Sequence, residues 1–228
     1  MTSTRSGVCF RSKMPRRVSK LTHQSPTRPV RCGTMVRVFC LSGWATTPDV
    51  RFWPSLCAAL ELKGHTVIKA TEPCSDGEIP KHCSHLKALV DANGGIGPDC
   101  FFIGWSIGAQ IIHRYLASQP AGTTVGGTAC LAAWVDLAAA TVESLGVEKV
   151  TPWIADKIDT EALQKVCGTL LCFVSTDDKI VGLLDKHEAS VRSVLSWADV
   201  QVATDRGHYQ VEALTEGEME KISAMLSL

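Results

Sequence analysis

The chain has no long apolar segment and no closely paired cysteines. None of its apolar runs approaches the roughly 18 residues that suggest a membrane-spanning helix, so we expect none. Its ten cysteines include no CxxC pair, which argues against a disulfide framework and against a zinc site. Cys40 and Cys130 are among those in apolar runs, where a thiol behaves as a small hydrophobic side chain. This usage favours a reducing compartment, and we expect neither a metal nor an organic cofactor.

Residues 1–34 contain no acidic side chain, although they contain eight basic ones. They are rich in Ser, Thr and Pro and have no hydrophobic periodicity, which predicts a basic, disordered N-terminal extension. They also lack the apolar core of a secretory signal. Three interpretations stay open: an upstream stretch that precedes a functional start at Met35 in a cytoplasmic protein, a mitochondrial transit peptide, or a nucleic-acid-binding arm.

The rest of the chain is acidic. Of the 23 basic and 23 acidic side chains, residues 35–228 keep 15 basic and 23 acidic, a net charge of −8. Gripping nucleic acid requires a basic face, so the body is expected to have no nucleic-acid partner. No G-x-G-x-x-G follows a strand-like run in the body, which disfavours a dinucleotide-binding enzyme.

Short apolar runs alternate with amphipathic runs from Met35 onward. Such alternation is typical of a parallel sheet covered by helices. We predict one α/β domain over residues 35–228: a doubly wound, mostly parallel sheet of about six strands with helices on both faces. The long excursion over residues 135–168 would form a small lid above the ligand crevice at the carboxyl edge of the sheet. The predicted strands are 36–41, 65–70, 99–104, 127–134, 169–175 and 199–204.

The segment GWSIG, residues 104–108, matches the pattern G-x-S-x-G between a predicted strand and a predicted helix. The pattern presents a serine nucleophile on a strained strand-to-helix turn, which leaves room only for small neighbours such as Gly104 and Gly108. The helix start adds free N–H groups and the positive end of a dipole. We predict Ser106 as the nucleophile; the alternative is a small-residue turn that only joins a strand to a helix.

A serine hydroxyl needs a base, and the base needs an acid to orient it. His208 follows the last predicted strand, and Asp177 and Asp178 follow the strand before it. The chain order Ser, Asp, His is that of this strand–turn–helix context, and all three follow carboxyl ends of strands. We predict Ser106, Asp178 and His208 as the catalytic residues, with Asp177 and then Asp136 as alternative acids. Otherwise the aspartates only cap a helix and His208 is a loop residue.

Two backbone amides and two tryptophans complete the predicted site. Ile107, directly after the nucleophile, and Trp44, in the loop after the first body strand, would form an oxyanion hole through their N–H groups. The alternative for the Trp44 loop is a turn that only covers the core. Trp105 and Trp153 would line an apolar substrate pocket.

With these residues, the chain resembles the α/β-hydrolase superfamily over nearly all of residues 35–228. It is most similar to the small serine hydrolases typified by retinoblastoma-binding protein nine, through STDD after a strand, GHYQ before the last helix and TPW in the excursion. LSGW and GWSIG also resemble segments of pimeloyl-ester carboxylesterases. The resemblance implies Ser106, Asp178 and His208 as a catalytic triad.

The sequence therefore predicts a carboxylesterase-like serine hydrolase that cleaves small acyl esters, with amides as a second class, through an acyl-enzyme. The partner would be a small-molecule acyl substrate, with no nucleic acid and no membrane; no oligomeric state is predicted. The alternative is a non-catalytic binding module on the same scaffold, because a fold alone does not define a function.

Overall fold

Six strands form one parallel sheet. The computed structural model describes residues 35–182 and 186–227, and the predicted extension, residues 1–34, lies outside that part of the chain. The strand order is β2-β1-β3-β4-β5-β6, and all five neighbouring pairs are parallel. The strands are β1 (Arg37–Leu41), β2 (Thr66–Lys69), β3 (Cys100–Trp105), β4 (Gly127–Leu131), β5 (Leu170–Ser175) and β6 (Asp199–Ala203).

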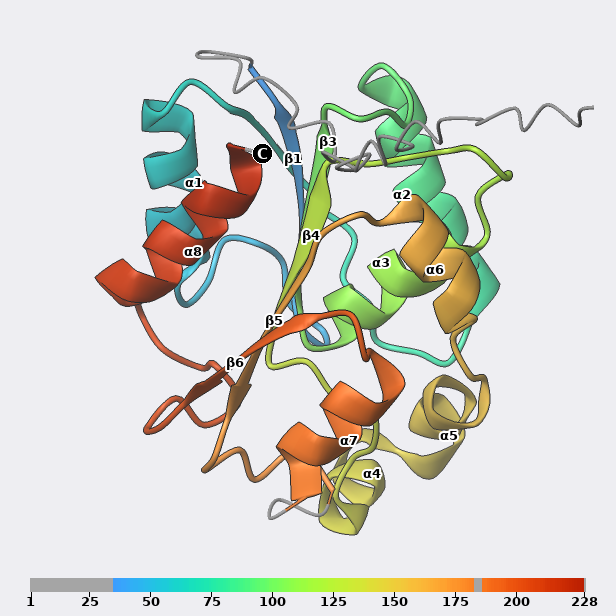
Figure 1. Cartoon of the computed structure of the whole chain (residues 1–228). Coiled ribbons are helices and arrows are strands. Elements are labelled where there is room, and N and C mark those ends of the chain that lie inside the picture. The colour runs from blue at the N-terminus through green and yellow to red at the C-terminus, as the bar shows by residue number, and fades with distance from the viewer. Residues whose placement is uncertain (1–34, 183–185, 228) are drawn as a thin grey trace, which may run out of the picture. The chain divides into compact units, whose positions relative to one another are not determined.

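Helices cover both faces of this sheet, as Figure 1 shows for α1 and α8 on one side and α2, α3 and α6 on the other. The predicted α/β fold with about six strands is thus confirmed. Among the described residues, no helix is both long and apolar enough to cross a membrane. The helices are α1 (Trp53–Leu62), α2 (Ile79–Ala92), α3 (Ile107–Ala117), α4 (Ala139–Leu145), α5 (Val147–Ala155), α6 (Thr160–Val166), α7 (His187–Val194) and α8 (Glu216–Leu226).

The sheet separates two apolar cores. Phe39 and Phe102 stack at 5.1 Å between ring centroids in the core that α2, α3, α6 and α7 cover. The next residues on the same strands, such as Phe101 and Ile103, point into the core under α1 and α8. Because both faces are buried, β3 and β5 are buried at every position and read as continuous apolar runs.

The fourth strand is shorter than the sequence indicates. We expected a strand over residues 127–134, but β4 ends at Leu131. Ala132 has a φ of 49°, in the left-handed region that residues other than glycine rarely adopt. The chain therefore leaves the sheet at this residue, and the apolar side chains that follow, including Trp134, become available to a cavity.

The predicted excursion, residues 135–168, contains three helices with different roles. α6 packs against α3, and its Leu163 and Val166 are buried, so α6 belongs to the helical layer over the sheet. Residues of α4 and α5 instead line the cavity beside Ser106. The part of the excursion that borders the site is therefore α4 and α5.

One buried histidine on α3 makes the stability of the fold depend on pH. His113 is only 2% exposed, and its Nε2 lies 3.1 Å from Sγ of Cys130. Burial disfavours the charged imidazolium and lowers the pKa of His113 from 6.5 to about 4. Between these two values the unfolded chain binds the proton and the folded chain does not, so stability is lost as the pH falls below the unfolded value.

We predict that replacing His113 by Gln weakens this pH dependence. From pH 7 to pH 5, the wild type should lose about 2 kcal/mol of unfolding free energy through His113 alone. His113→Gln should be less stable than wild type at pH 7 but should lose about 2 kcal/mol less over the same interval. Urea unfolding at the two pH values measures this, and equal losses in both proteins would contradict it.

Candidate active site

Ser106 stands at the junction of β3 and α3 in a strained conformation. Its φ is 53° and its ψ is −116°, and its N–H donates to the carbonyl oxygen of Leu131 at 2.9 Å. A serine at the start of a helix usually caps it with its hydroxyl, but no such bond is made here. The backbone strain instead aims the hydroxyl away from the helix.

The two flanking glycines are required by close backbone contacts. A Cβ at Gly108 would lie 2.4 Å from the carbonyl oxygen of Leu41, at the end of β1. A Cβ at Gly104 would lie 2.6 Å from the backbone of Ala109 in α3. Real Cβ atoms do not approach backbone atoms this closely, so any other residue at either position would force the backbone of the turn to shift.

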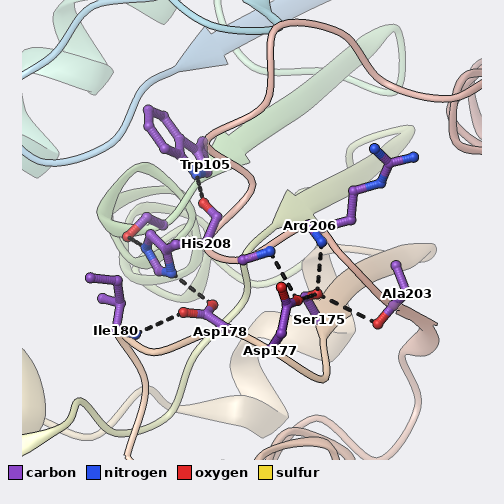
Figure 2. Close-up of polar contacts among 10 residues, drawn as sticks. Trp105, Ser175, Asp177, Asp178, Ile180, Ala203, Arg206 and His208 are labelled. Atoms are coloured by element: carbon purple, nitrogen blue, oxygen red, sulfur yellow. Dashed lines mark hydrogen bonds and ion pairs between the residues drawn. The ribbon is translucent and has the colours of Figure 1, made fainter.

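Ser106, His208 and Asp178 form a continuous hydrogen-bonded series. The Ser106 Oγ lies 2.7 Å from His208 Nε2, and His208 Nδ1 lies 2.8 Å from Asp178 Oδ2. The second carboxylate oxygen of Asp178 accepts the backbone N–H of Ile180 at 3.0 Å (Figure 2). Asp178 is fully buried, while Ser106 and His208 are each 8% exposed. When the neutral His208 ring carries its proton on Nδ1, that N–H donates to Asp178, and Nε2 is left to accept the serine proton.

The neighbouring Asp177 points the other way (Figure 2). Its carboxylate accepts the hydroxyl of Ser175 and, at 3.0 Å, the N–H of Gly207. These bonds, with that of Ser175 first, lower the pKa of Asp177. Asp177 therefore tethers the loop that carries His208. The other alternative acid, Asp136, is exposed, and its Oδ1 accepts the N–H of Leu137.

The side chain of Trp105 contacts His208. Its indole Nε1–H donates to the carbonyl oxygen of His208 at 2.7 Å, and the two rings lie 6.3 Å apart (Figure 2). The ring also packs edge-on against Phe52. Trp105 also lines the cavity, whose use as a substrate pocket stays a prediction, and its bond to His208 fixes the backbone of the histidine loop, which the sequence did not indicate.

Trp44 and Ile107 both line the cavity that Ser106 also lines. Within the described part of the chain, neither backbone N–H has a hydrogen-bond acceptor. Ile107 is the first residue of α3, whose early N–H groups have no partner inside the helix. An oxyanion hole requires two free N–H donors near the serine hydroxyl, and these two amides are the candidates for it.

The cavity beside Ser106 has a volume of about 410 Å³ and mostly apolar walls. Trp153 of α5 lines it, together with Trp134, Leu137 and Val150, which the sequence patterns did not indicate; that the cavity is a substrate pocket stays a prediction. The end of β4 at Leu131, three residues earlier than expected, frees the segment with Trp134 from the sheet. Among the described lining residues, Arg51 is the only one with a permanent charge.

Within residues 35–182 and 186–227, no group of three or more His, Cys, Asp or Glu side chains is arranged to bind a metal ion.

Solved structures with a similar fold include the ydeN gene product and two carboxylesterases. The ydeN gene product of B. subtilis has a TM-score of 0.69 at 14% identity, covering 85% of this chain and 100% of that chain. A carboxylesterase of the thaumarchaeon Nitrososphaera gargenis has a TM-score of 0.65 at 14% identity, covering 85% and 90%. The carboxylesterase CesB of Bacillus subtilis has a TM-score of 0.61 at 12% identity, covering 84% of each chain.

These likenesses show that the chain shares the fold of these proteins, and the resemblance to the α/β-hydrolase superfamily stays a prediction. No protein-family model matches the sequence, and no curated protein matches it. The finer resemblances, to the small serine hydrolases typified by retinoblastoma-binding protein nine and to pimeloyl-ester carboxylesterases, stay predictions.

We predict that Gly108→Ala destabilises the protein by about 1–3 kcal/mol, because the new methyl group overlaps the carbonyl of Leu41. Gly217 is a matched control, since it is also the second residue of a helix but has open space around its Cα. Gly217→Ala should be neutral or stabilising by up to about 1 kcal/mol. Urea unfolding of the two variants measures the contrast, and equal effects would refute the contact as its cause.

Proposed function

We propose that the chain is a serine hydrolase that cleaves small acyl esters. The observation that carries this proposal is the hydrogen-bonded series from Ser106 Oγ through His208 to Asp178, at 2.7 and 2.8 Å, beside an apolar cavity. A surface serine without these partners is a weak nucleophile.

The geometry supports a two-step mechanism. In the first step, His208 Nε2 takes the proton of Ser106 as Oγ attacks the acyl carbonyl carbon. Asp178 stabilises the imidazolium and holds its tautomer. The N–H groups of Trp44 and Ile107 donate to the oxyanion. The tetrahedral intermediate then collapses, and His208 gives the proton to the departing alcohol.

In the second step, water replaces the alcohol. His208 takes a proton from the water as its oxygen attacks the acyl-serine carbonyl, and then returns the proton to Ser106 Oγ as the acid departs. The apolar walls of the cavity favour an uncharged acyl group. Amides form a second class, because the same histidine can protonate an amine.

We predict that a fluorophosphonate probe labels the wild type and that labelling disappears in Ser106→Ala and His208→Ala. Asp178→Asn should reduce ester hydrolysis by about 10⁴-fold, since the asparagine cannot hold the required tautomer. Asp177→Asn is the matched control: its amide oxygen still accepts from Gly207 and Ser175, so activity should fall less than about tenfold.

The opposite outcomes have distinct meanings. If Asp177→Asn abolished activity and Asp178→Asn did not, the assignment of the acid would be wrong. If the wild type folded but took no probe and cleaved no ester or amide, the binding-module alternative would replace the enzyme.

We further propose that residues 35–228 are the hydrolase domain and residues 1–34 an appended extension, with the protein in the cytoplasm. Fusion of residues 1–34 to a fluorescent protein should leave the fluorescence in the cytoplasm. Mitochondrial fluorescence with removal of the extension would instead establish a transit peptide.

A further inference from the structure

The helix that begins at Ser106 carries two buried polar side chains that the proposed mechanism does not use. Gln110 and Arg114 lie one turn apart on α3 and are 5% and 8% exposed. The Gln110 Nε2–H donates to the carbonyl oxygen of Trp134 at 2.7 Å, and Arg114 Nη1–H donates to Gln110 Oε1 at 2.7 Å. Arg114 Nη2–H donates to the carbonyl oxygen of Trp153 at 2.8 Å. We call Gln110 and Arg114 the α3 relay.

The relay joins two tryptophans that line the cavity, Trp134 just before the excursion and Trp153 within it. Trp134 is 5% exposed and Trp153 is 2% exposed, and both border the cavity that holds Ser106. Their backbones are linked through the relay to the nucleophile's own helix. The distance from Ser106 to both indole walls is therefore set by one rigid element.

Trp153 is held from two further sides. Its ring lies under the guanidinium of Arg114, 5.3 Å from the guanidinium carbon to the ring centroid. Its Nε1–H donates to the carbonyl oxygen of Asp76 at 2.9 Å, in the loop before α2. The next contact, from Arg114 Nε to Asp156 Oδ2 at 3.1 Å, fixes the end of α5. These contacts attach the C-terminal end of α5 to α3 and to the loop before α2.

Every nitrogen of the Arg114 guanidinium donates a hydrogen bond. It makes five bonds: Nε to Asp156, Nη1 to the side chain and carbonyl of Gln110, and Nη2 to the carbonyls of Trp153 and Asp156. An arginine has five N–H donors in a planar fork, and lysine has three on a single atom. A buried guanidinium is costly to desolvate, and burial lowers the pKa of Arg114. A site that keeps such a group in this position has a use for its geometry.

We propose that Gln110 and Arg114 are positioning residues that determine acyl-group specificity: they hold Trp134 and Trp153 at a set distance from Ser106, and the cavity consequently selects uncharged acyl chains by length. The proposal rests on the proposed hydrolase function. A short acyl group makes little contact with the two tryptophan side chains. Each methylene added to the chain and buried against them raises kcat/KM by about fourfold until the cavity is filled.

The experiment compares p-nitrophenyl acetate, butyrate, hexanoate and octanoate as substrates. Wild type should show a rise in kcat/KM with chain length followed by a maximum. In Arg114→Lys, the ratio of kcat/KM for the best ester to that for acetate should fall about tenfold, because the tryptophan walls shift while the Ser106–His208 pair stays. The loss should appear mainly as a higher KM for the longer esters.

Arg192→Lys is the matched control. Arg192 also lies on a helix and also bonds to a side chain one turn before it, Glu188, but it is exposed, and neither of its partners, Glu188 and Val200, lines the cavity. Its length profile should equal that of wild type. Urea unfolding of each variant separates a loss of stability from a change of specificity.

If Arg114→Lys does not fold, Asp156→Ala provides the test instead. The Asp156 carboxylate is 59% exposed, so its loss should be tolerated, while Arg114 Nε loses its acceptor. This variant should lower the same ratio about threefold. A length profile parallel to that of wild type in a folded, active variant would overturn the inference and leave the hydrolase intact. A wild type that takes no fluorophosphonate and cleaves no ester would overturn both.

Discussion

The contact between the start of α3 and the end of β1 is the constraint on which the site depends. At Gly108 the backbone of the helix comes so close to Leu41 that a single Cβ would lie 2.4 Å from its carbonyl oxygen. This approach sets the strained φ of Ser106 and places the amide of Ile107 beside the loop that carries Trp44. Without it, the serine hydroxyl would be free to cap the helix, as serines at helix starts usually do.

The parallel sheet supplies the remaining groups. All six strands run the same way, so the loops after β3, β5 and β6 meet at one edge. Ser106, Asp178 and His208 come from these three loops, and Asp177 and Trp105 fix the histidine loop from two sides. α3 then extends from Ser106 to Gln110 and Arg114, whose side chains bond to the backbones of Trp134 and Trp153, so one helix connects Ser106 to that wall of the cavity.

Much of this arrangement could be predicted from local patterns. The six apolar runs indicated the six strands, and GWSIG indicated the turn with Ser106. The choice between Asp177 and Asp178 could not be derived as firmly, because two adjacent aspartates in one loop follow the same strand and fit the same motif. It follows from opposite side-chain directions, one toward the amide of Gly207 and one toward His208.

The sequence by itself determined the α/β class, the chain order of serine, aspartate and histidine, and the need for glycine on both sides of Ser106. Hydrophobic periodicity acts within each short segment, the G-x-S-x-G pattern lies within five residues, and the order of the three polar residues is read directly from the chain. Only the tertiary structure decided that β4 ends at Leu131, that Trp134 lines the cavity and that Arg114 joins α3 to α5. Those contacts unite segments from 20 to more than 40 residues apart in the chain, and they form only when separate elements pack together, which no local pattern encodes.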